Sequence, residues 1–366
     1  MFPPYIYQPT YLIVATILAL ICFSQYNNRK GTITVTNSHS IGGILLTSFY
    51  VLFIGLRPTV GKGLSGAFGD TVNYIRQYNL LEDSPFFFSF DTENVIFDNL
   101  FSWWASESLG ITPFFLLCNF LYFACAYKAI VKMFPEDRYA VFLVFLTAFS
   151  AYSASVNAVK AGVAGSIFLL ALAYRQNLII SIPLVLISLG FHHSMNVLVA
   201  AYICCMIVKR PKYFYFAWIF SLCMALAHVT YFQVLFAGFT DDHGASYLLS
   251  VGENWGGKST GFRFDFVLYS VMPLIMGWYA IKKRRINDDL YNFILSVYIF
   301  SNSIWLLCMY ASFTNRIAYL SWFMYPIVIV YPCLLPQFGA DRYKVFAKVA
   351  TLHLAFTIFM NVVYYG

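Results

Sequence analysis

Apolar segments of similar length recur along the chain, and short polar breaks separate them. A helix needs about 20 residues to cross the hydrocarbon core of a bilayer, so each such segment is a candidate membrane helix. About twelve segments meet this criterion. They lie near residues 5–25, 41–56, 111–130, 139–154, 157–174, 178–191, 195–208, 213–232, 264–281, 290–310, 317–336 and 345–363. The pattern predicts an all-α, polytopic transmembrane helical bundle.

The composition excludes a soluble globular protein. Hydrophobic residues make up 60% of the 366 positions and charged residues only 11%, whereas soluble domains carry roughly a quarter charged residues. The net charge of +7 does not indicate nucleic-acid binding, because Lys and Arg are scattered between apolar segments and form no recognisable nucleic-acid module. Membrane lipid is therefore an expected partner, and nucleic acid is not.

Lys and Arg residues concentrate in alternate breaks, which the positive-inside rule assigns to the cytoplasm. These cations are Arg29, Lys30, Lys128, Lys132, Arg138, Arg175, Lys209, Arg210, Lys212, Lys282, Lys283, Arg284, Arg285, Arg342, Lys344 and Lys348. An even number of helices then places both termini outside. We expect two longer outer loops, residues 57–110 and 233–263, in a single integral membrane domain over residues 1–366.

A few cations remain on the predicted outer side, where the same rule disfavours them. Arg57 ends the second predicted helix, and Lys160 lies about one turn inside the fifth. Arg263 precedes the ninth, and Arg316 begins the eleventh. We expect them to face one outer vestibule suited to an anion, since charges within membrane helices are usually functional. The alternative is that each reaches the interface or pairs locally, as Arg263 would with Asp265.

Small residues surround Lys160. They are Ala161, Gly162, Ala164, Gly165 and Ser166. Small side chains allow membrane helices to approach closely. We therefore expect Lys160 to face protein and not lipid.

Six short motifs carry a family resemblance. They are GLR at residues 55–57, GDTVNY at 69–74, VNAVKAG at 156–162, FHHS at 191–194, GFRFDF at 261–266 and TNRIAYLSWF at 314–323. In this order, and with a shared outer position, they resemble the EpsG-type branch of the Wzy-like bacterial polysaccharide polymerases. The family often has Asn-x-x-Arg-Gln where this chain has Asn157, Lys160 and Ala161. A lysine there supplies charge without the planar fork that grips a phosphate at two points.

The resemblance implies polymerisation of undecaprenyl-diphosphate-linked oligosaccharide repeat units at the periplasmic face of a bacterial inner membrane, as for an O-antigen, capsule or exopolysaccharide. It implies a membrane glycosyltransferase without cofactor or metal. Its expected partners are lipid-linked glycans, a chain-length regulator and a flippase. From the outer cations and these motifs together, the residues expected to bind the diphosphate or the rest of the substrate are Arg57, Tyr74, Arg76, Asn157, Lys160, Arg263, Asp265, Asn315, Arg316 and Tyr319.

Glycosyl transfer from a lipid diphosphate makes two chemical demands. The leaving diphosphate gains charge as the glycosidic bond breaks, and fixed Arg and Lys side chains stabilise that charge. The acceptor hydroxyl loses a proton, so a carboxylate or imidazole is needed within reach. Asp70, beside Tyr74 on the first long loop, is the best-placed carboxylate, and His192 or His193 is the alternative base.

The catalytic candidates also have structural interpretations. Asp70, followed by Thr71 and Val72, resembles a helix start and would then be an N-cap residue. One of His192 and His193 is expected to be an interfacial residue, because adjacent side chains on a helix point about 100° apart and seldom share a site.

Three other functions fit parts of the sequence. A transporter that flips lipid-linked oligosaccharide shares the helices, the lipid substrate and the cations, and only catalysis separates it from a polymerase. A membrane O-acyltransferase requires a histidine in the bilayer, but its motif pattern is lacking. GLSG at residues 63–66 resembles the serine motif of rhomboid proteases, yet a motif this short has a high false-positive rate.

Overall fold

The computed structural model describes residues 2–29, 37–237, 261–312 and 314–364, and within these ranges it contains helices and no β-strand. This confirms the all-α prediction. The chain divides into two compact units, Met1–Met195 with Ala340–Gly366, and Asn196–Gly339. This division rests on how compactly the residues pack, and it does not test whether the chain forms the predicted single membrane domain.

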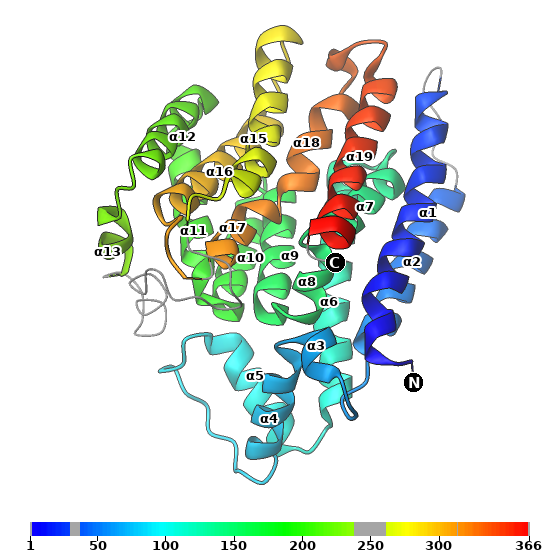
Figure 1. Cartoon of the computed structure of the whole chain (residues 1–366), viewed down its shortest axis with the longest axis vertical. Coiled ribbons are helices and arrows are strands. Elements are labelled where there is room, and N and C mark those ends of the chain that lie inside the picture. The colour runs from blue at the N-terminus through cyan, green and yellow to red at the C-terminus, as the bar shows by residue number, and fades with distance from the viewer. Residues whose placement is uncertain (1, 30–36, 238–260, 313, 365–366) are drawn as a thin grey trace. The chain divides into compact units, whose positions relative to one another are not determined.

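The first unit is a bundle centred on one long helix, α6. Its elements are η1 (Pro4–Ile6), α1 (Tyr7–Asn27), α2 (Asn37–Gly55), α3 (Leu64–Phe68), α4 (Thr71–Leu81), α5 (Val95–Ser106), α6 (Ile111–Met133), α7 (Arg138–Leu146), α8 (Ala151–Val156), α9 (Val159–Ala173), α10 (Leu178–Phe191), η2 (His193–Met195), α19 (Arg342–Phe359) and η5 (Met360–Tyr364). Helix α6 packs against α2 and α9, α10 packs against α9, and α1 packs against α19 and α7 (Figure 1).

Helix α1 shows how these helices suit a membrane. Tyr11, Ala15 and Ala19 are fully buried against the bundle, whereas Ile13 and Ile17 are exposed. A helix that is apolar on its outer as well as its inner face is stable only where lipid covers the outer face. The exposed isoleucines therefore mark a lipid-facing side of the first unit.

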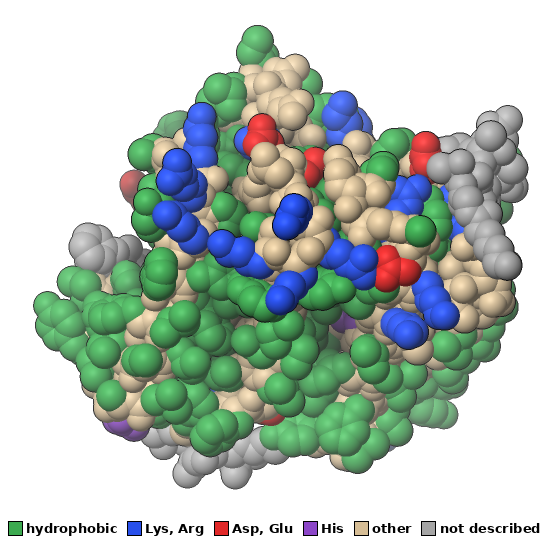
Figure 2. All heavy atoms as spheres, turned by 90° about the horizontal axis from the view of Figure 1, so that it is seen from above, with side chains coloured by type: hydrophobic (Ala, Val, Ile, Leu, Met, Phe, Trp, Pro, Cys, Tyr) green, Lys and Arg blue, Asp and Glu red, His purple; other side chains and the backbone are tan. Residues whose placement is uncertain are grey.

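The predicted cytoplasmic cations of the first unit gather at one end of it. Arg29, after α1, forms an ion pair of 2.9 Å with Asp137, just before α7, and its guanidinium carbon lies 3.9 Å from the ring centroid of Tyr343 on α19. Lys132 on α6 lies 5.4 Å from the ring centroid of Tyr174, at the end of α9. These contacts bring together the helix ends that the positive-inside rule requires on one side. Figure 2 shows Lys and Arg side chains on the face that it draws, with apolar side chains around them.

The predicted span 139–154 is interrupted. Helix α7 covers only its first part, and α8 begins after a turn. At the break, the Leu143 carbonyl accepts hydrogen bonds from both the backbone N–H of Thr147, at 2.9 Å, and Thr147 Oγ1, at 2.8 Å, an arrangement that tends to bend a helix. The end of α8 nevertheless reaches the opposite end of the unit, where the Val156 carbonyl accepts a hydrogen bond from Thr71. Two short helices thus cross the unit where one was expected.

The predicted outer loop 57–110 is largely helical. It folds into α3, α4 and α5, which lie at the end of the first unit where α2 ends and α6 begins (Figure 1). Phe97, Phe101 and Ala105 recur at every fourth position of α5 and are buried, which gives this helix one apolar face. Helix α5 packs against α4, α6 and α10. The loop is therefore a folded cap on one end of the unit.

The second unit is organised around α16. Its elements are α11 (Asn196–Ile207), α12 (Pro211–Leu226), α13 (Tyr231–Ala237), α15 (Phe264–Trp278), η3 (Tyr279–Lys283), α16 (Asp289–Leu307), α17 (Thr314–Trp322), α18 (Tyr325–Leu334) and η4 (Pro336–Phe338). Helix α16 packs against α11, α12, α15, α17 and α18. The core of this unit holds two tryptophans whose indole N–H groups are hydrogen-bonded, as buried tryptophans usually require. Trp322 Nε1 donates to Ser270 Oγ at 2.8 Å, and Trp305 Nε1 donates to Thr314 Oγ1 at 2.9 Å.

Several helices have the length and composition of membrane spans. In the described ranges, six qualify: Pro4–Asn27, Ile111–Met133, Phe264–Lys283, Asp289–Leu307, Thr314–Leu334 and Arg342–Tyr364. Four shorter apolar helices are Ile41–Gly55, Val159–Ala173, Leu178–Phe191 and His193–Ile207. This set fits a multi-pass membrane protein, whereas the predicted count of about twelve spans is not confirmed. Most of the predicted outer loop 233–263 lies outside the described residues.

Candidate functional site

The end of the first unit opposite its Lys- and Arg-rich end gathers most of the predicted site residues. There, the end of α2, helices α3 to α5, the start of α9 and the end of α10 lie together. The predicted residues on these elements are Arg57, Asp70, Tyr74, Arg76, Asn157, Lys160, His192 and His193. Arg76 lies on α4 with its side chain exposed, whereas the others contact protein groups described below or are at least partly buried.

Arg57 is a fully buried cation just after α2. Its Nε donates to Thr71 Oγ1 at 3.2 Å and its Nη1 to the Ile54 carbonyl at 3.1 Å, while the guanidinium carbon lies 3.9 Å from the ring centroid of Phe115 on α6. Burial lowers the pKa of Arg57 to about 10, so the side chain is still charged at pH 7. Its Nη2 makes no hydrogen bond to the described residues. Because its described hydrogen-bond partners are neutral, Arg57 contributes net positive charge to this end of the unit.

Asp70 stands at the N-cap position of α4, but its side chain makes no capping hydrogen bond. Asp70 therefore occupies the N-cap position, as predicted, but its side chain does not cap the helix. The preceding Gly69 has a φ of 41°, and a Cβ atom there would lie 2.9 Å from Asn157 Oδ1. Glycine is required for both the backbone conformation and the close approach. This contact sets the turn before α4 against the link between α8 and α9.

The ring of Tyr74, on α4, packs against Phe97 and Phe101 of α5. The backbone N–H of Lys160, at the start of α9, lies near the Tyr74 hydroxyl. Burial raises the pKa of Tyr74 above its ordinary value, and the nearby Asp70 raises it further. The phenol therefore stays protonated at pH 7 and acts as a neutral hydrogen-bonding group.

Lys160 faces protein, as its small neighbours predict. Its Nζ forms an ion pair of 2.6 Å with Asp98 Oδ1 on α5 and lies 4.9 Å from the ring centroid of Phe97. A Cβ atom at Gly162 would clash with the Ala154 carbonyl, so glycine allows the start of α9 to pack on the backbone of α8. The Lys160 and Asp98 side chains remain 24% and 25% exposed, which leaves the pair accessible to a ligand.

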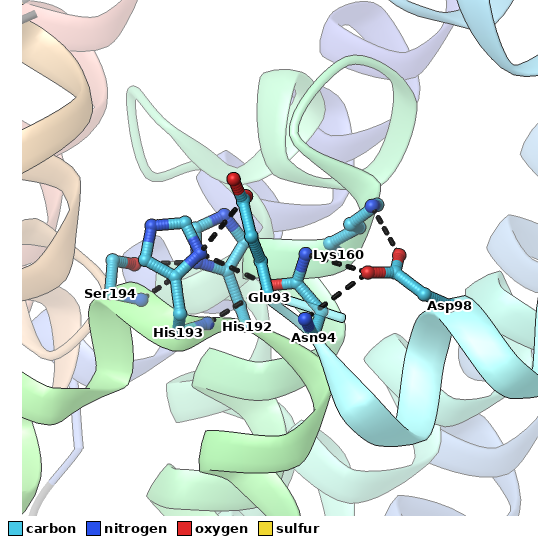
Figure 3. Close-up of polar contacts among 7 residues, drawn as sticks. All are labelled: Glu93, Asn94, Asp98, Lys160, His192, His193 and Ser194. Atoms are coloured by element: carbon cyan, nitrogen blue, oxygen red, sulfur yellow. Dashed lines mark hydrogen bonds and ion pairs between the residues drawn. The ribbon is translucent and has the colours of Figure 1, made fainter. Parts of the chain in front are cut away.

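A chain of polar contacts continues from this ion pair to the histidines (Figure 3). Asp98 Oδ2 accepts hydrogen bonds from the Asn94 backbone N–H at 3.1 Å and from Asn94 Nδ2 at 3.3 Å. Asn94 Oδ1 accepts a hydrogen bond from the His193 backbone N–H at 3.0 Å. Glu93 Oε2 lies 3.8 Å from His193 Nδ1. Lys160 on α9 is thereby linked through α5 to His193 in η2.

The two histidines lie side by side, which differs from the prediction. Helix α10 ends at Phe191, and His192 has an extended backbone with φ of −154° and ψ of 121°. The expected divergence of about 100° assumed a continuous helix, and that assumption is wrong here. The imidazole rings of His192 and His193 stack with centroids 4.9 Å apart at an angle of 22°. Both histidines therefore belong to one site.

The remaining predicted residues lie in the second unit. Arg263, which precedes α15, binds Asp265 through two hydrogen bonds, from Nε to Oδ1 at 2.9 Å and from Nη2 to Oδ2 at 2.6 Å. This is the local pairing that was the alternative explanation for Arg263. Asn315, Arg316 and Tyr319 lie on α17, where the Arg316 side chain is exposed and the other two are partly buried. The prediction of one vestibule shared by all the outer cations stays a prediction.

Three polar residues of the site are missing from the sequence prediction, namely Glu93, Asn94 and Asp98. A signal for them existed. Lys160 is a cation near a membrane helix end and needs a carboxylate, and the predicted outer loop 57–110 is rich in acids. The sequence gives no means of choosing Asp98 among those acids. In the part of the chain that the structure describes, no group of three or more His, Cys, Asp or Glu side chains is arranged to hold a metal ion.

The match to known proteins is a family match. The EpsG family model matches residues 42–366. No curated protein and no solved structure matches the chain. The matched range includes every element that carries a predicted site residue, from the end of α2 to α17.

Proposed function

Because the chain belongs to the EpsG family, a family of Wzy-like polysaccharide polymerases, we propose that it joins lipid-linked oligosaccharide repeat units into a polysaccharide. The growing glycan leaves its undecaprenyl diphosphate carrier and is transferred to a hydroxyl of the next lipid-linked unit. The reaction takes place at the periplasmic face of a bacterial inner membrane. Its product is an O-antigen, capsule or exopolysaccharide.

The observation that carries this proposal is the polar chain from Lys160 to His193. It combines an ammonium group, carboxylates and imidazoles on one partly exposed surface at the end of the unit away from its Lys- and Arg-rich face. Glycosyl transfer from a diphosphate needs positive charge for the leaving group and a base for the acceptor hydroxyl. Both kinds of group occur there among the side chains of the chain itself.

The leaving diphosphate gains negative charge as its bond to the sugar breaks. Arg57 stabilises this charge from its buried position, where low polarity strengthens electrostatic interactions. Lys160 is nearer to solvent, but Asp98 already compensates its charge. A phosphate group that binds Lys160 must therefore compete with the Asp98 carboxylate. In this proposal, positive charge fixed by the protein takes the part that a divalent metal would otherwise play.

The second unit supplies further substrate contacts. Arg316 is exposed on α17 and has the guanidinium fork that binds phosphate or carboxylate oxygens at two points. Asn315 and Tyr319, on the same helix, offer hydrogen bonds to sugar hydroxyls. Arg263 is held by Asp265 and orients the start of α15. A flippase delivers the lipid-linked units, and a chain-length regulator sets the length of the product.

Deletion of the gene in cells that make the polysaccharide tests the proposal. Loss of a polymerase should leave single repeat units on lipid in the outer leaflet, where an impermeant oxidant such as periodate modifies their sugars in spheroplasts. Loss of a transporter should instead leave them in the inner leaflet and protected. Protected single units would overturn the polymerase proposal in favour of the flippase.

A further inference from the structure

The adjacent histidines of the site differ in what their Nδ1 atoms face. His193 Nδ1 lies 3.3 Å from Asn94 Oδ1. His192 Nδ1 lies 3.1 Å from the backbone nitrogen of Ser194 and 2.7 Å from Ser194 Oγ. A neutral imidazole carries one hydrogen, and the partner of one ring nitrogen decides which nitrogen holds it. The two rings can therefore be assigned separately.

The orientation of the Asn94 amide is fixed from both sides. The His193 backbone N–H can only donate, so the Asn94 atom that faces it at 3.0 Å is the oxygen. The ionised Asp98 carboxylate can only accept, so the Asn94 atom that faces it at 3.3 Å is the nitrogen. An amide oxygen is an acceptor only. His193 Nδ1, next to that oxygen, therefore carries the hydrogen, and the lone pair of this ring lies on Nε2.

His192 has the opposite arrangement. The backbone N–H of Ser194 can only donate, so His192 Nδ1 accepts and holds the lone pair. The neutral ring then carries its hydrogen on Nε2. This contact lies where the extended backbone of His192 ends α10 and η2 begins at His193.

We propose that these opposite tautomers divide the chemistry of the site, with His193 Nε2 as the general base and His192 Nε2–H as a hydrogen-bond donor to a substrate oxygen. This inference rests on the proposed glycosyl transfer. The proton of the acceptor hydroxyl moves to His193 Nε2 while the hydroxyl oxygen forms a bond to the anomeric carbon. The bond from that carbon to the diphosphate oxygen breaks, and the diphosphate leaves with the electron pair.

Asn94 and Glu93 are positioning residues in this scheme. Asn94 holds His193 in the tautomer that can accept a proton at Nε2, and the contacts of Asn94 to Asp98 keep the amide in place. Glu93 lies 3.8 Å from His193 Nδ1 and stabilises the imidazolium once the proton has been taken up. The Lys160–Asp98 pair therefore affects the base through Asn94, at the other end of the polar chain.

Nitrogen NMR of the full-length protein, labelled with ¹⁵N-histidine, tests the tautomers directly. Each signal is assigned to the histidine whose replacement, in His192→Gln or His193→Gln, removes it. The spectra are recorded at a pH where both rings are neutral. We expect the Nδ1–H form for His193 and the Nε2–H form for His192. Finding the Nε2–H form for both would overturn the inference.

Two Asn94 variants separate positioning from folding. Asn94→Leu in a Glu93→Ala background removes both acceptors near His193 Nδ1, so His193 should change to the Nε2–H form. Asn94→Asp in the same background keeps an acceptor oxygen for Nδ1, and the backbone N–H of residue 94 can still hold Asp98, so His193 should keep Nδ1–H. A His193 tautomer that does not respond to Asn94→Leu in the folded Glu93→Ala protein would contradict the role of Asn94.

The two glutamine variants then test the division of roles in polymer formation. Glutamine places an N–H donor near the position of Nε2 but cannot act as a base. His193→Gln should lower the rate roughly 100-fold to 10,000-fold, as expected for loss of a general base, whereas His192→Gln should lower it less than about tenfold. Equal losses or the reverse order would contradict the assignment. If the wild-type protein makes no polymer, the proposed function fails, and the NMR spectra still decide the tautomers.

Discussion

Lys160 and Asp98 form an ion pair of 2.6 Å although they lie 62 residues apart in the sequence. The pair joins the first turn of α9 to α5, and Asp98 also holds Asn94. It therefore connects a membrane helix to the folded cap that carries the histidine contacts.

The Lys160–Asp98 pair should show coupling in a double-mutant cycle. Lys160→Met and Asp98→Asn each leave one partner alone, so each should destabilise the protein, and the double variant should lose less than the sum. Because the pair is partly exposed, we expect a coupling of roughly 0.2–1 kcal/mol. Unfolding of the detergent-solubilised variants measures it. Strict additivity would mean that the two side chains do not stabilise each other.

The same variants should differ in polymer formation. Lys160→Met removes a cation from the site, whereas Asp98→Asn keeps it and still offers an oxygen that accepts from Asn94. We expect Lys160→Met to lower the rate at least about tenfold more than Asp98→Asn, since a charged hydrogen bond is worth roughly 1.5–3 kcal/mol. A larger loss for Asp98→Asn would show that the carboxylate matters more than the ammonium group.

Arg57 should be important for stability as well as for activity. Arg57→Met removes two buried hydrogen bonds and the contact with the Phe115 ring, and leaves the Thr71 hydroxyl and the Ile54 carbonyl with fewer partners. We expect a loss of roughly 1–3 kcal/mol in the free energy of unfolding. Lys62→Met is the matched control, because Lys62 is an exposed cation of the same loop and should change stability by less than about 0.5 kcal/mol. An Arg57→Met protein as stable as the control would restrict Arg57 to a role in substrate binding.

Asp70 should respond to substitution differently from His193. If His193 is the base, Asp70→Asn should retain activity within about tenfold of the wild type, because it keeps the shape and the hydrogen-bonding capacity of the residue. A general-base aspartate would instead lose roughly 100-fold to 10,000-fold. Polymer yield at matched membrane expression measures the difference. A dead Asp70→Asn beside an active His193→Gln would return the base role to Asp70.

The sidedness of the first unit can be tested by cysteine labelling in a variant that lacks the eight native cysteines. Lys62 and Lys344 are both exposed and lie at the two predicted faces of this unit. Lys62→Cys should react with an impermeant thiol reagent added from the periplasmic side, and Lys344→Cys should react only after the membrane is opened. The reverse result would place the site in the cytoplasm.

The sequence pattern predicted the helical class, the membrane setting and the helix ends that carry the cations. Those features depend on composition and on period, which are local properties of the chain. The break between α7 and α8 was not predictable in this way, because small and apolar residues continue through it and no Gly or Pro marks it.

The site was predictable in its residue types and less so in its contacts. Arg57, Lys160 and the histidines stand out as polar groups next to apolar segments. The partner of Lys160 depends on how the cap folds back onto α9 and α10, which is a long-range property. The stacking of His192 on His193 depends on the end of α10 at Phe191, and a sequence without a Gly or Pro directly after that point gives little indication of it.

Reconstitution in liposomes tests most directly whether the protein joins lipid-linked repeat units by itself. Purified protein should convert a lipid-diphosphate-linked repeat unit into a ladder of whole-number multiples on a gel, without nucleotide sugar and with a chelator present. His193→Gln protein should leave the single unit unchanged in the same assay. If the wild-type protein forms no ladder while labelled lipid crosses the liposome bilayer, the protein is a transporter and not a polymerase.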